Sequence, residues 1–211
     1  MKVSVIIPAY NEKDNVISLA RDIINKIDDV EIIIVDDSKE DNISSSIKKT
    51  DKIKHIFRGK KLGRGSAVIE GMDYLIKNTD TKIFIEMDAD YSHDPNELKK
   101  NLQFFKDEEF DLLISSRYLA KSEIINWPLA RRIFSFMANL VARLLLRVPV
   151  SDYTNGYRIY SSSAAKHIAS NCGKIGDGFI ILSEILVELY YNKFNIGETN
   201  SKFINRVRGE S

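Results

Sequence analysis

Residues 81–105 read TKIFIEMDADYSHDPNELKKNLQFF. KIFIEM (82–87) has the apolar, β-branched pattern of a buried strand, and a helical pattern follows the acidic loop DADYSH (88–93). Asp94 is placed to cap this helix, because a proline stands at the first helical position and Glu97 at the third. A strand, a loop and a helix in this order form the repeating unit of a parallel α/β sheet.

The same alternation recurs along the chain. The other strand candidates are VSVII (3–7), EIIIV (31–35) and DLLISS (111–116), and helical patterns cover 14–27, the stretch from Pro128, 161–170 and 179–192, before a final extended piece at 194–204. We therefore expect one α/β domain over 1–211, with a mostly parallel sheet covered by helices on both faces. Ligands bind at the carboxyl ends of such strands, so the loops of interest are PAYNE (8–12), DDSKED (36–41), DADYSH (88–93) and SSRY (115–118).

The composition restricts the class of protein. The 211 residues include 31 Lys plus Arg and 30 Asp plus Glu, so no overall field favours nucleic acid as a partner. A single cysteine, Cys172, excludes an internal disulfide and suits a reducing compartment, where a small buried residue is its expected role. The sequence shows no secretion signal and no apolar run of the ~18–20 residues that span a bilayer. We expect a soluble or peripheral protein.

Asp88 and Asp90 stand one residue apart at the end of a strand. Asp94 already provides the helix cap, and carboxylates at a buried strand end are costly unless a cation pairs with them. A calcium loop is excluded, because His93 replaces its glycine and Lys99 its final glutamate. Mg²⁺ or Mn²⁺, held by these carboxylates together with substrate phosphates, is favoured over a purely structural turn.

LGRGSAVIEG (62–71) contains Gly63 and Gly65 at the spacing of a dinucleotide fingerprint. Val68 stands where the third glycine is needed, and the loop follows the third strand candidate, a strand-like run that contains His55, rather than the first. We therefore expect these glycines to permit a tight turn and a close approach of the backbone to a donor substrate.

Several motifs in order carry a family resemblance: VSVIIPAYNE, IIIVDDS, LGRGSAVIEG, MDADYSH, SSRY and NWPLARR. Together they resemble a family-2 glycosyltransferase with the GT-A fold. SSRY, NWPLARR and the final FINRVRGES (203–211) are similar more narrowly to the polyprenyl-phosphate (dolichyl-phosphate) mannosyltransferases.

The resemblance implies a donor site and a metal site. The nucleotide-sugar pocket would involve Pro8, Ala9, Tyr10, Glu12, Val35, Gly65, Asp88, Ala89 and Arg206, with Asp37 or its neighbour Asp36 on the nucleoside. Asp88 and Asp90 would hold Mg²⁺ or Mn²⁺ on the donor diphosphate. Ser92 stands where the family often has glutamine as a further metal ligand.

Three arginines far apart in sequence form the basic half of the expected site: Arg117, Arg131 and Arg206. A single arginine is more often a solvated surface residue, but guanidinium groups also bind phosphate oxygens in a bidentate manner. By the resemblance, Arg117 and Arg131 bind the acceptor phosphate together with Ser135, and with Asp90 they are the expected catalytic residues. SDYTNGYR (151–158) matches a further family segment, and Asp152 and Glu184 are either acceptor-site or structural groups. His55, His93 and His167 lack metal-ligand spacing and are not expected to be catalytic.

The stretch RRIFSFMANLVARLLLRV (131–148) is apolar over most of a helical surface. Its polar residues recur every four positions as Arg131, Ser135, Asn139, Arg143 and Arg147. Such a helix either packs against a core or lies in a bilayer interface, and a lipid-phosphate acceptor favours the interface.

The expected function is transfer of mannose from GDP-mannose to polyprenyl phosphate, with inversion, at the cytoplasmic face of a membrane. Residues 1–118 would bind the donor and 119–211 the acceptor. Many relatives continue beyond FINRVRGES into membrane helices, so either this protein contacts the membrane through the interfacial helix or an anchoring subunit, or the chain has been shortened. The alternatives are a UDP-glucose donor, a saccharide acceptor in surface polysaccharide synthesis, or a nucleotide-binding module without catalysis.

Overall fold

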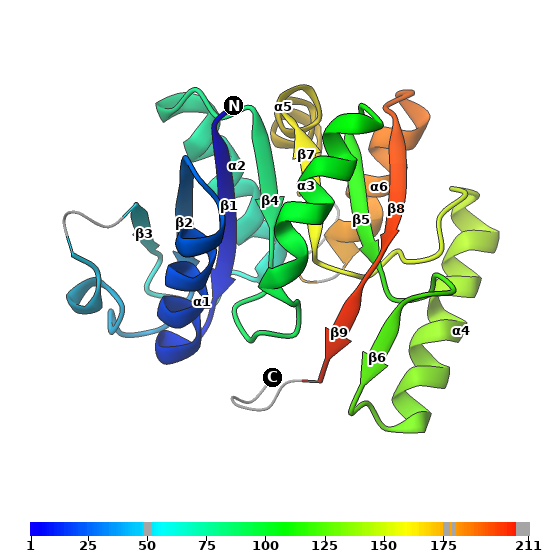
Figure 1. Ribbon diagram of the computed structural model, residues 1–211, viewed down its shortest axis with the longest axis horizontal. Coiled ribbons are helices and arrows are strands. Elements are labelled where there is room, and N and C mark those ends of the chain that lie inside the picture. Colours follow the sequence, from blue (N-terminus) through cyan, green and yellow to red (C-terminus); the bar gives the residue numbers. More distant parts are fainter. Residues whose placement is uncertain (49–51, 175–177, 179, 206–211) are drawn as a thin grey trace.

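The computed structural model describes residues 1–48, 52–174, 178 and 180–205. One sheet has the strand order β3-β2-β1-β4-β7-β5-β8 (Figure 1). Its strands are β1 (Val3–Ala9), β2 (Val30–Asp36), β3 (Ile53–Phe57), β4 (Ile83–Glu86), β5 (Leu112–Ser116), β7 (Arg158–Ser161) and β8 (Ile196–Asn200). Two short parallel strands, β6 (Glu123–Ile125) and β9 (Lys202–Ile204), form a separate pair.

Five of the helices cover the two faces of the sheet: α1 (Lys13–Lys26), α2 (Arg64–Asn78), α3 (Leu98–Asp107), α5 (Ser162–Asn171) and α6 (Ile180–Tyr191). The other helical elements are α4 (Leu129–Leu146) and the 3₁₀ turns η1 (Ser44–Ser46) and η2 (Pro95–Glu97). Strand side chains alternate between faces, so Ile32 and Ile34 join one core while Ile33 and Val35 join the other. The first core is closed by α1 and α3, and the second by α2, α5 and α6, as Figure 1 shows. The predicted α/β sheet with two covered faces is confirmed.

The helix start predicted at Asp94 is also confirmed. Asp94 Oδ1 accepts a hydrogen bond from Asn96 N at 2.9 Å, and Pro95 opens η2, which leads into α3. Glu97 does not complete a capping box with the backbone N–H of Asp94. Its Oε1 accepts from Lys202 N at 3.1 Å, which ties the start of α3 to β9.

Two strands were not predicted, β6 and β7, because runs of three and four residues give little periodicity. β7 is antiparallel to both β4 and β5, whereas the other pairings in the sheet are parallel. This reversal brings the segment before β7, with Asn155 and Gly156, to the edge where β4 and β5 end. The piece expected at 194–204 divides at Ser201 into β8 and β9, which belong to different sheets.

The helix α4 lies at one side of the molecule, apart from the helices that cover the sheet (Figure 1). Asn139 is its only buried residue, and it accepts a hydrogen bond from Tyr153 N at 2.7 Å. The apolar side chains point outward, with Phe134 76% and Leu145 74% exposed. The exposed apolar face consists of Leu129, Ile133, Phe134, Phe136, Met137, Leu140, Val141, Leu144 and Leu145. The polarity of α4 is therefore the reverse of that of a helix packed against the core of this chain. Its contact with a bilayer stays a prediction.

Candidate active site

Functional loops meet at one edge of the sheet. β2, β1 and β4 are parallel neighbours, so their carboxyl ends adjoin. At these ends lie, in the same order, Asp36–Ser38, Pro8–Glu12 and Asp88–Ser92. β5 is separated from β4 only by β7, and Arg117 follows its carboxyl end. An acidic half on β2 and β4 therefore lies beside a cationic half that begins at β5.

The loops after β1 and β2 are tied together. Asn11, in the left-handed region at φ 56°, donates its backbone N–H to Ser38 Oγ at 2.9 Å. Glu12 is buried, and its Oε2 accepts from Asn15 Nδ2 at 2.6 Å. The ring of Tyr10 lies under the Lys61 ammonium, with 4.7 Å from Nζ to the ring centroid. Val35 and Ala9 are buried in the strands behind these loops, and Pro8 is half-buried.

Asp37 fixes the approach to α2. Its Oδ2 accepts from the backbone N–H groups of Leu62 and Gly63, both at 2.9 Å, and its Oδ1 pairs with Arg58. Gly63 adopts φ 97°, which requires glycine and turns the chain into the helix. The predicted tight turn is thus present.

Asp36 is held separately. Its Oδ1 accepts from Ser38 N at 2.9 Å, and His55 Nε2 lies 3.4 Å from Oδ2. Burial raises the pKa of Asp36, but the hydrogen bonds from His55 and Ser38 bring that pKa below its ordinary value. Asp36 and Asp37 therefore both stabilise loops, and a contact of either with a nucleoside stays a prediction.

Gly65, expected at the donor, lies in α2 against α6. A Cβ at this position would be 2.6 Å from Ile181 Cγ2. The missing side chain therefore permits close packing of the two helices, and its predicted contact with the donor stays a prediction.

The centre of the acidic half is an ion-pair network around Asp88. Arg64 Nε lies 2.7 Å from Asp88 Oδ1, and Arg64 Nη1 lies 2.5 Å from Oε1 of the fully buried Glu86. Tyr160 donates its hydroxyl to Glu86 Oε2 at 2.7 Å. Burial raises the pKa of Asp88, but attraction by Arg64 and the hydrogen bond from His93 hold that pKa well below its usual range.

His93 is part of this network, although its spacing gave no reason to expect it. Its Nε2 lies 3.1 Å from Asp88 Oδ2, and a carboxylate only accepts, so Nε2 carries the proton. The ring is fully buried against Tyr157 and Phe203, with centroid distances of 5.6 and 5.4 Å. His93 therefore orients Asp88 rather than acting as an exposed base.

The carboxylates of Asp88 and Asp90 fit one mode of metal binding. Within the described parts of the chain, no group of three or more His, Cys, Asp or Glu side chains is arranged to hold a metal. Mg²⁺ and Mn²⁺ are often held by one or two carboxylates while water and substrate phosphates complete the shell, and this pair suits that mode. Ser92 is buried beside them and donates its backbone N–H to Asp90 Oδ1 at 3.0 Å.

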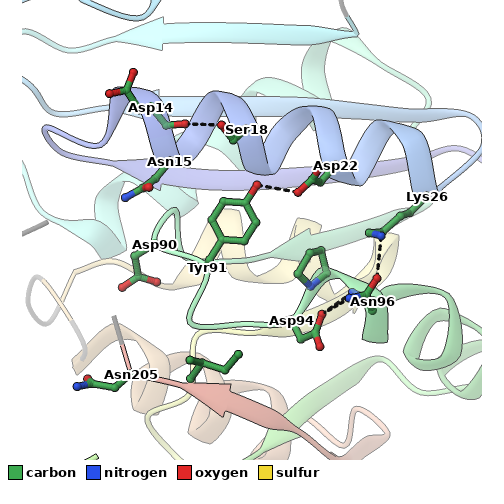
Figure 2. Close-up of a pocket in the computed structure, with 12 residues that line it drawn as sticks. Asp14, Asn15, Ser18, Asp22, Lys26, Asp90, Tyr91, Asp94, Asn96 and Asn205 are labelled. Atoms are coloured by element: carbon green, nitrogen blue, oxygen red, sulfur yellow. Dashed lines mark hydrogen bonds between the residues drawn. The ribbon is translucent and has the colours of Figure 1, made fainter. Parts of the chain in front are cut away.

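Asp90 also lines a cavity of about 650 Å³ between α1 and the loop after β4. In Figure 2 Asp90, Asn15 and Asn205 lie near one end of this cavity, and the ring of Tyr91 reaches α1. The Tyr91 hydroxyl donates to Asp22 at 2.8 Å, and its backbone is left-handed at φ 58°. The Asp90 loop is thus fastened to α1 by a residue in a conformation that bulky side chains seldom adopt.

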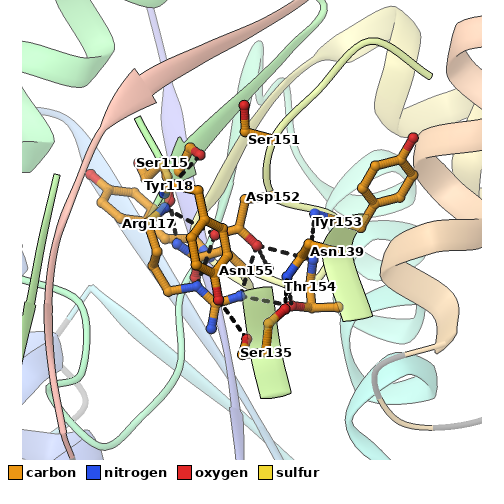
Figure 3. A network of polar contacts seen from close by, with 12 residues as sticks. Ser115, Arg117, Tyr118, Ser135, Asn139, Ser151, Asp152, Tyr153, Thr154 and Asn155 are labelled. Carbon is orange, nitrogen blue, oxygen red and sulfur yellow. Dashed lines mark hydrogen bonds and ion pairs between the residues drawn. The ribbon is translucent and has the colours of Figure 1, made fainter. Parts of the chain in front are cut away.

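The cationic half is built around Arg117 (Figure 3). Its Nε and Nη2 lie 2.8 and 2.7 Å from the two oxygens of Asp152, and Nη2 also donates to Thr154 Oγ1 at 2.7 Å. Burial lowers the pKa of Arg117, but the bonds to Asp152 and a smaller attraction from Asp88 raise that pKa above its ordinary value. Asp152 is therefore the ion-pair partner of Arg117. Glu184 accepts a hydrogen bond from Gly173 N at 3.1 Å, so each carboxylate has a partner within the protein.

Trp127 lies between the two predicted catalytic arginines. Its ring centroid is 5.4 Å from the Arg117 guanidinium carbon and 4.4 Å from that of Arg131. Arg131 is exposed and donates to Asn205 Oδ1 at 3.2 Å, while Ser135 accepts from the Tyr118 hydroxyl at 2.6 Å. The third predicted arginine, Arg206, lies outside the described residues.

A cleft of about 350 Å³ opens beside Arg117. It is lined by Arg117, Tyr118, Ser122, Ile124, Arg132, Ile133 and Phe136. Cations thus lie at a cleft whose other walls, apart from Ser122, are apolar or aromatic and continue onto the exposed face of α4. Arg132, which the sequence did not single out, is the second cation of this cleft.

The profile of the family described as "Glycosyl transferase family 2" matches residues 4–169, which include both acidic loops and Arg117. The chain belongs to this family. The transferase is 31% identical to polyprenol monophosphomannose synthase of Mycolicibacterium smegmatis, over 98% of the chain and 79% of the relative. It is 34% identical to dolichol-phosphate mannosyltransferase of Pyrococcus furiosus, of which it spans 59%.

Solved structures confirm the GT-A fold. Glucosyl-3-phosphoglycerate synthase of Mycobacterium tuberculosis, in complex with phosphoglyceric acid, matches the whole transferase with a TM-score of 0.70 at 17% identity and over 72% of its own chain. The same synthase in complex with Mn²⁺, UDP and phosphoglyceric acid gives a TM-score of 0.68 at 17% identity, over 71% of its chain. At this identity the likeness concerns the fold alone.

Arg64, Glu86 and His93 were missed by the sequence reasoning. Glu86 offered a signal, because a carboxylate inside the apolar strand IFIE requires a buried partner. Arg64, between two glycines, is the matching cation, 22 residues before Glu86 in the sequence.

Proposed function

We propose that this family-2 transferase moves a hexose, with mannose from GDP-mannose as the first choice, onto a polyprenyl phosphate at a membrane surface. The observation that carries the proposal is the cleft that joins Arg117 and Arg132 to the apolar face of α4. A phosphate group suits the guanidinium groups, and an isoprenoid chain suits the apolar walls. The two mannosyl-transferring relatives support the same acceptor class.

The acidic half suits the donor. Asp88 and Asp90 would hold Mg²⁺ or Mn²⁺, which supplies charge neutralisation at the leaving diphosphate. The loops after β1 and β2, with Tyr10 and Glu12, would bind the nucleoside part of the donor.

The cationic half suits the acceptor. A phosphate monoester is largely ionised at neutral pH, so its oxygen can attack the anomeric carbon without a strong base. Arg117 and Arg131 would orient that oxygen in line with the bond to the diphosphate, which breaks as the new bond forms. A single displacement of this kind inverts the anomeric centre.

The exposed face of α4 supports contact with a membrane. A lipid surface would cover its outward apolar side chains, while Arg143 and Arg147, also exposed, would lie near the headgroups. No helix within the described residues is long and apolar enough to cross a bilayer. An anchoring subunit is needed only if α4 alone does not hold the protein at the membrane surface.

The direct test supplies radiolabelled GDP-mannose or UDP-glucose, Mn²⁺, and either polyprenyl phosphate or a soluble oligosaccharide. We expect the label to enter the lipid fraction from GDP-mannose. Transfer from UDP-glucose alone would assign UDP-glucose as the donor in place of GDP-mannose. A saccharide that outcompetes the lipid would assign a saccharide as the acceptor. Nucleotide binding that is independent of metal, without any transfer, would overturn the enzymatic function.

A further inference from the structure

Arg64 occupies the position of a cation within the acidic half. It is the first residue of α2, and the loop before it is fixed by Asp37. Its guanidinium lies between Glu86 and Asp88, at 2.5 and 2.7 Å from their oxygens. The side chain is thus engaged by two carboxylates, one of which belongs to the expected metal site.

The surroundings hold the guanidinium in this place. Glu86 is fully buried, and its second oxygen is satisfied by the Tyr160 hydroxyl at 2.7 Å. A Cβ on Gly156 would lie 2.0 Å from Arg64 Nη2, so the absence of a side chain there provides the necessary space. Three elements, α2, β4 and the segment before β7, therefore hold the Arg64 guanidinium in one position.

A cation so close to Asp88 disfavours the binding of a second cation by the same carboxylate. A divalent ion on Asp88 and Asp90 would lie a few ångströms from the guanidinium, and unit charges at such distances interact strongly where water is partly excluded. The donor diphosphate brings negative charge that offsets this repulsion. The metal and the donor should therefore favour each other's binding, and such coupling is reciprocal.

We infer that Arg64 is a resident cation that makes divalent-metal binding at Asp88 and Asp90 depend on the donor diphosphate. This inference rests on the proposed metal–diphosphate site and adds an order of binding to it. Arg64 is in this sense a positioning residue: it acts through Asp88. Removal of Arg64 should strengthen the binding of the metal in the absence of donor. Metal binding then depends less on the donor diphosphate.

The test measures free Mn²⁺ by electron paramagnetic resonance in titrations of the full chain, with and without GDP, and with UDP in parallel. We expect GDP to tighten Mn²⁺ binding to the wild type by about tenfold or more. Arg64→Met should tighten the binding of Mn²⁺ alone by about tenfold, since one repelling charge is lost. Arg64→Lys keeps the charge and should bind Mn²⁺ alone as weakly as the wild type.

A further variant separates charge from folding. Arg64→Met leaves Glu86 without its cation, so Arg64→Met with Glu86→Gln is measured as well. It should show a smaller tightening, because a negative charge is lost together with the guanidinium. Circular dichroism confirms that each variant is folded.

Equal or weaker binding of Mn²⁺ alone in both folded Arg64→Met variants would overturn the inference. This outcome leaves the proposed function intact if GDP still couples to Mn²⁺ and sugar transfer continues. Failure of the wild type to bind Mn²⁺ with either nucleotide would instead contradict the metal site itself.

Discussion

Arg117 and Asp152 form a bidentate ion pair, with 2.7 Å from Nη2 to Oδ1 and 2.8 Å from Nε to Oδ2. Asp152 is fully buried and is itself fixed by the backbone N–H groups of Thr154 and Asn155. The Arg117 guanidinium is therefore held in place before any phosphate arrives, which reduces the entropy that binding must overcome.

Replacement of Asp152 by Asn should leave a buried guanidinium without its counter-charge. We expect the free energy of unfolding to fall by about 3–5 kcal/mol, measured by urea denaturation. Thr154→Val is the matched control, because it keeps the ion pair and removes the hydrogen bond to Arg117 and a long one of 3.5 Å from Asn139. It should cost about 1–3 kcal/mol. A loss in Asp152→Asn no larger than that in Thr154→Val would contradict the importance of the ion pair.

The same pair makes stability depend on pH. Burial raises the pKa of Asp152, but the bonds from Arg117 lower it overall, so the folded-state pKa lies below the unfolded value. Asp152 therefore stabilises the fold above the unfolded pKa of about 3.9, and this contribution is lost as pH falls through the folded-state pKa. Urea midpoints at decreasing pH should fall more steeply for the wild type than for Asp152→Asn. Parallel curves for the two proteins would be inconsistent with this assignment.

Gly65 allows a test of a structural role against a role in donor binding. Gly65→Ala places a methyl group against Ile181, and we expect a loss of about 1–3 kcal/mol in unfolding free energy. Adding Ile181→Ala removes the Cγ2 atom that the new methyl group meets, so the loss in the double variant should be smaller than the sum of the two single losses. If Gly65→Ala keeps full stability but loses affinity for GDP, the packing explanation is wrong.

The exposed face of α4 should bind lipid. We expect the wild type to sediment with vesicles of anionic phospholipid, and Phe134→Ser, Leu144→Ser and Leu145→Ser combined to abolish this. Because these side chains are exposed, the free energy of unfolding should change by less than about 1 kcal/mol. Ile180→Gln, an exposed apolar position on α6, serves as the control and should not affect sedimentation. A wild type that ignores vesicles but dimerises through α4 would assign this face to a second copy of the chain.

Local patterns in the sequence predicted what depends on local structure. Asp94 caps its helix, and the apolar runs become strands, because capping and burial follow from residues close together in the chain. β7 escaped prediction because its partners lie about 45 and 75 residues away, and four residues carry little periodicity of their own. Arg64, Glu86 and Asp88 come together only through the sheet, so their network follows from tertiary structure. For α4, the amphipathic pattern is visible in the sequence, but the face that points outward is set by tertiary structure.

Transfer of sugar to lipid tests the central claim most directly. Labelled GDP-mannose, Mn²⁺ and polyprenyl phosphate would be supplied to the wild type, to Asp90→Ala and to Arg131→Ala, with Lys99→Ala on the exposed side of α3 as the control. We expect label to enter the lipid fraction with the wild type and Lys99→Ala, and transfer to be lost in the other two variants while they remain folded. Unchanged transfer in both Asp90→Ala and Arg131→Ala would contradict the proposed function.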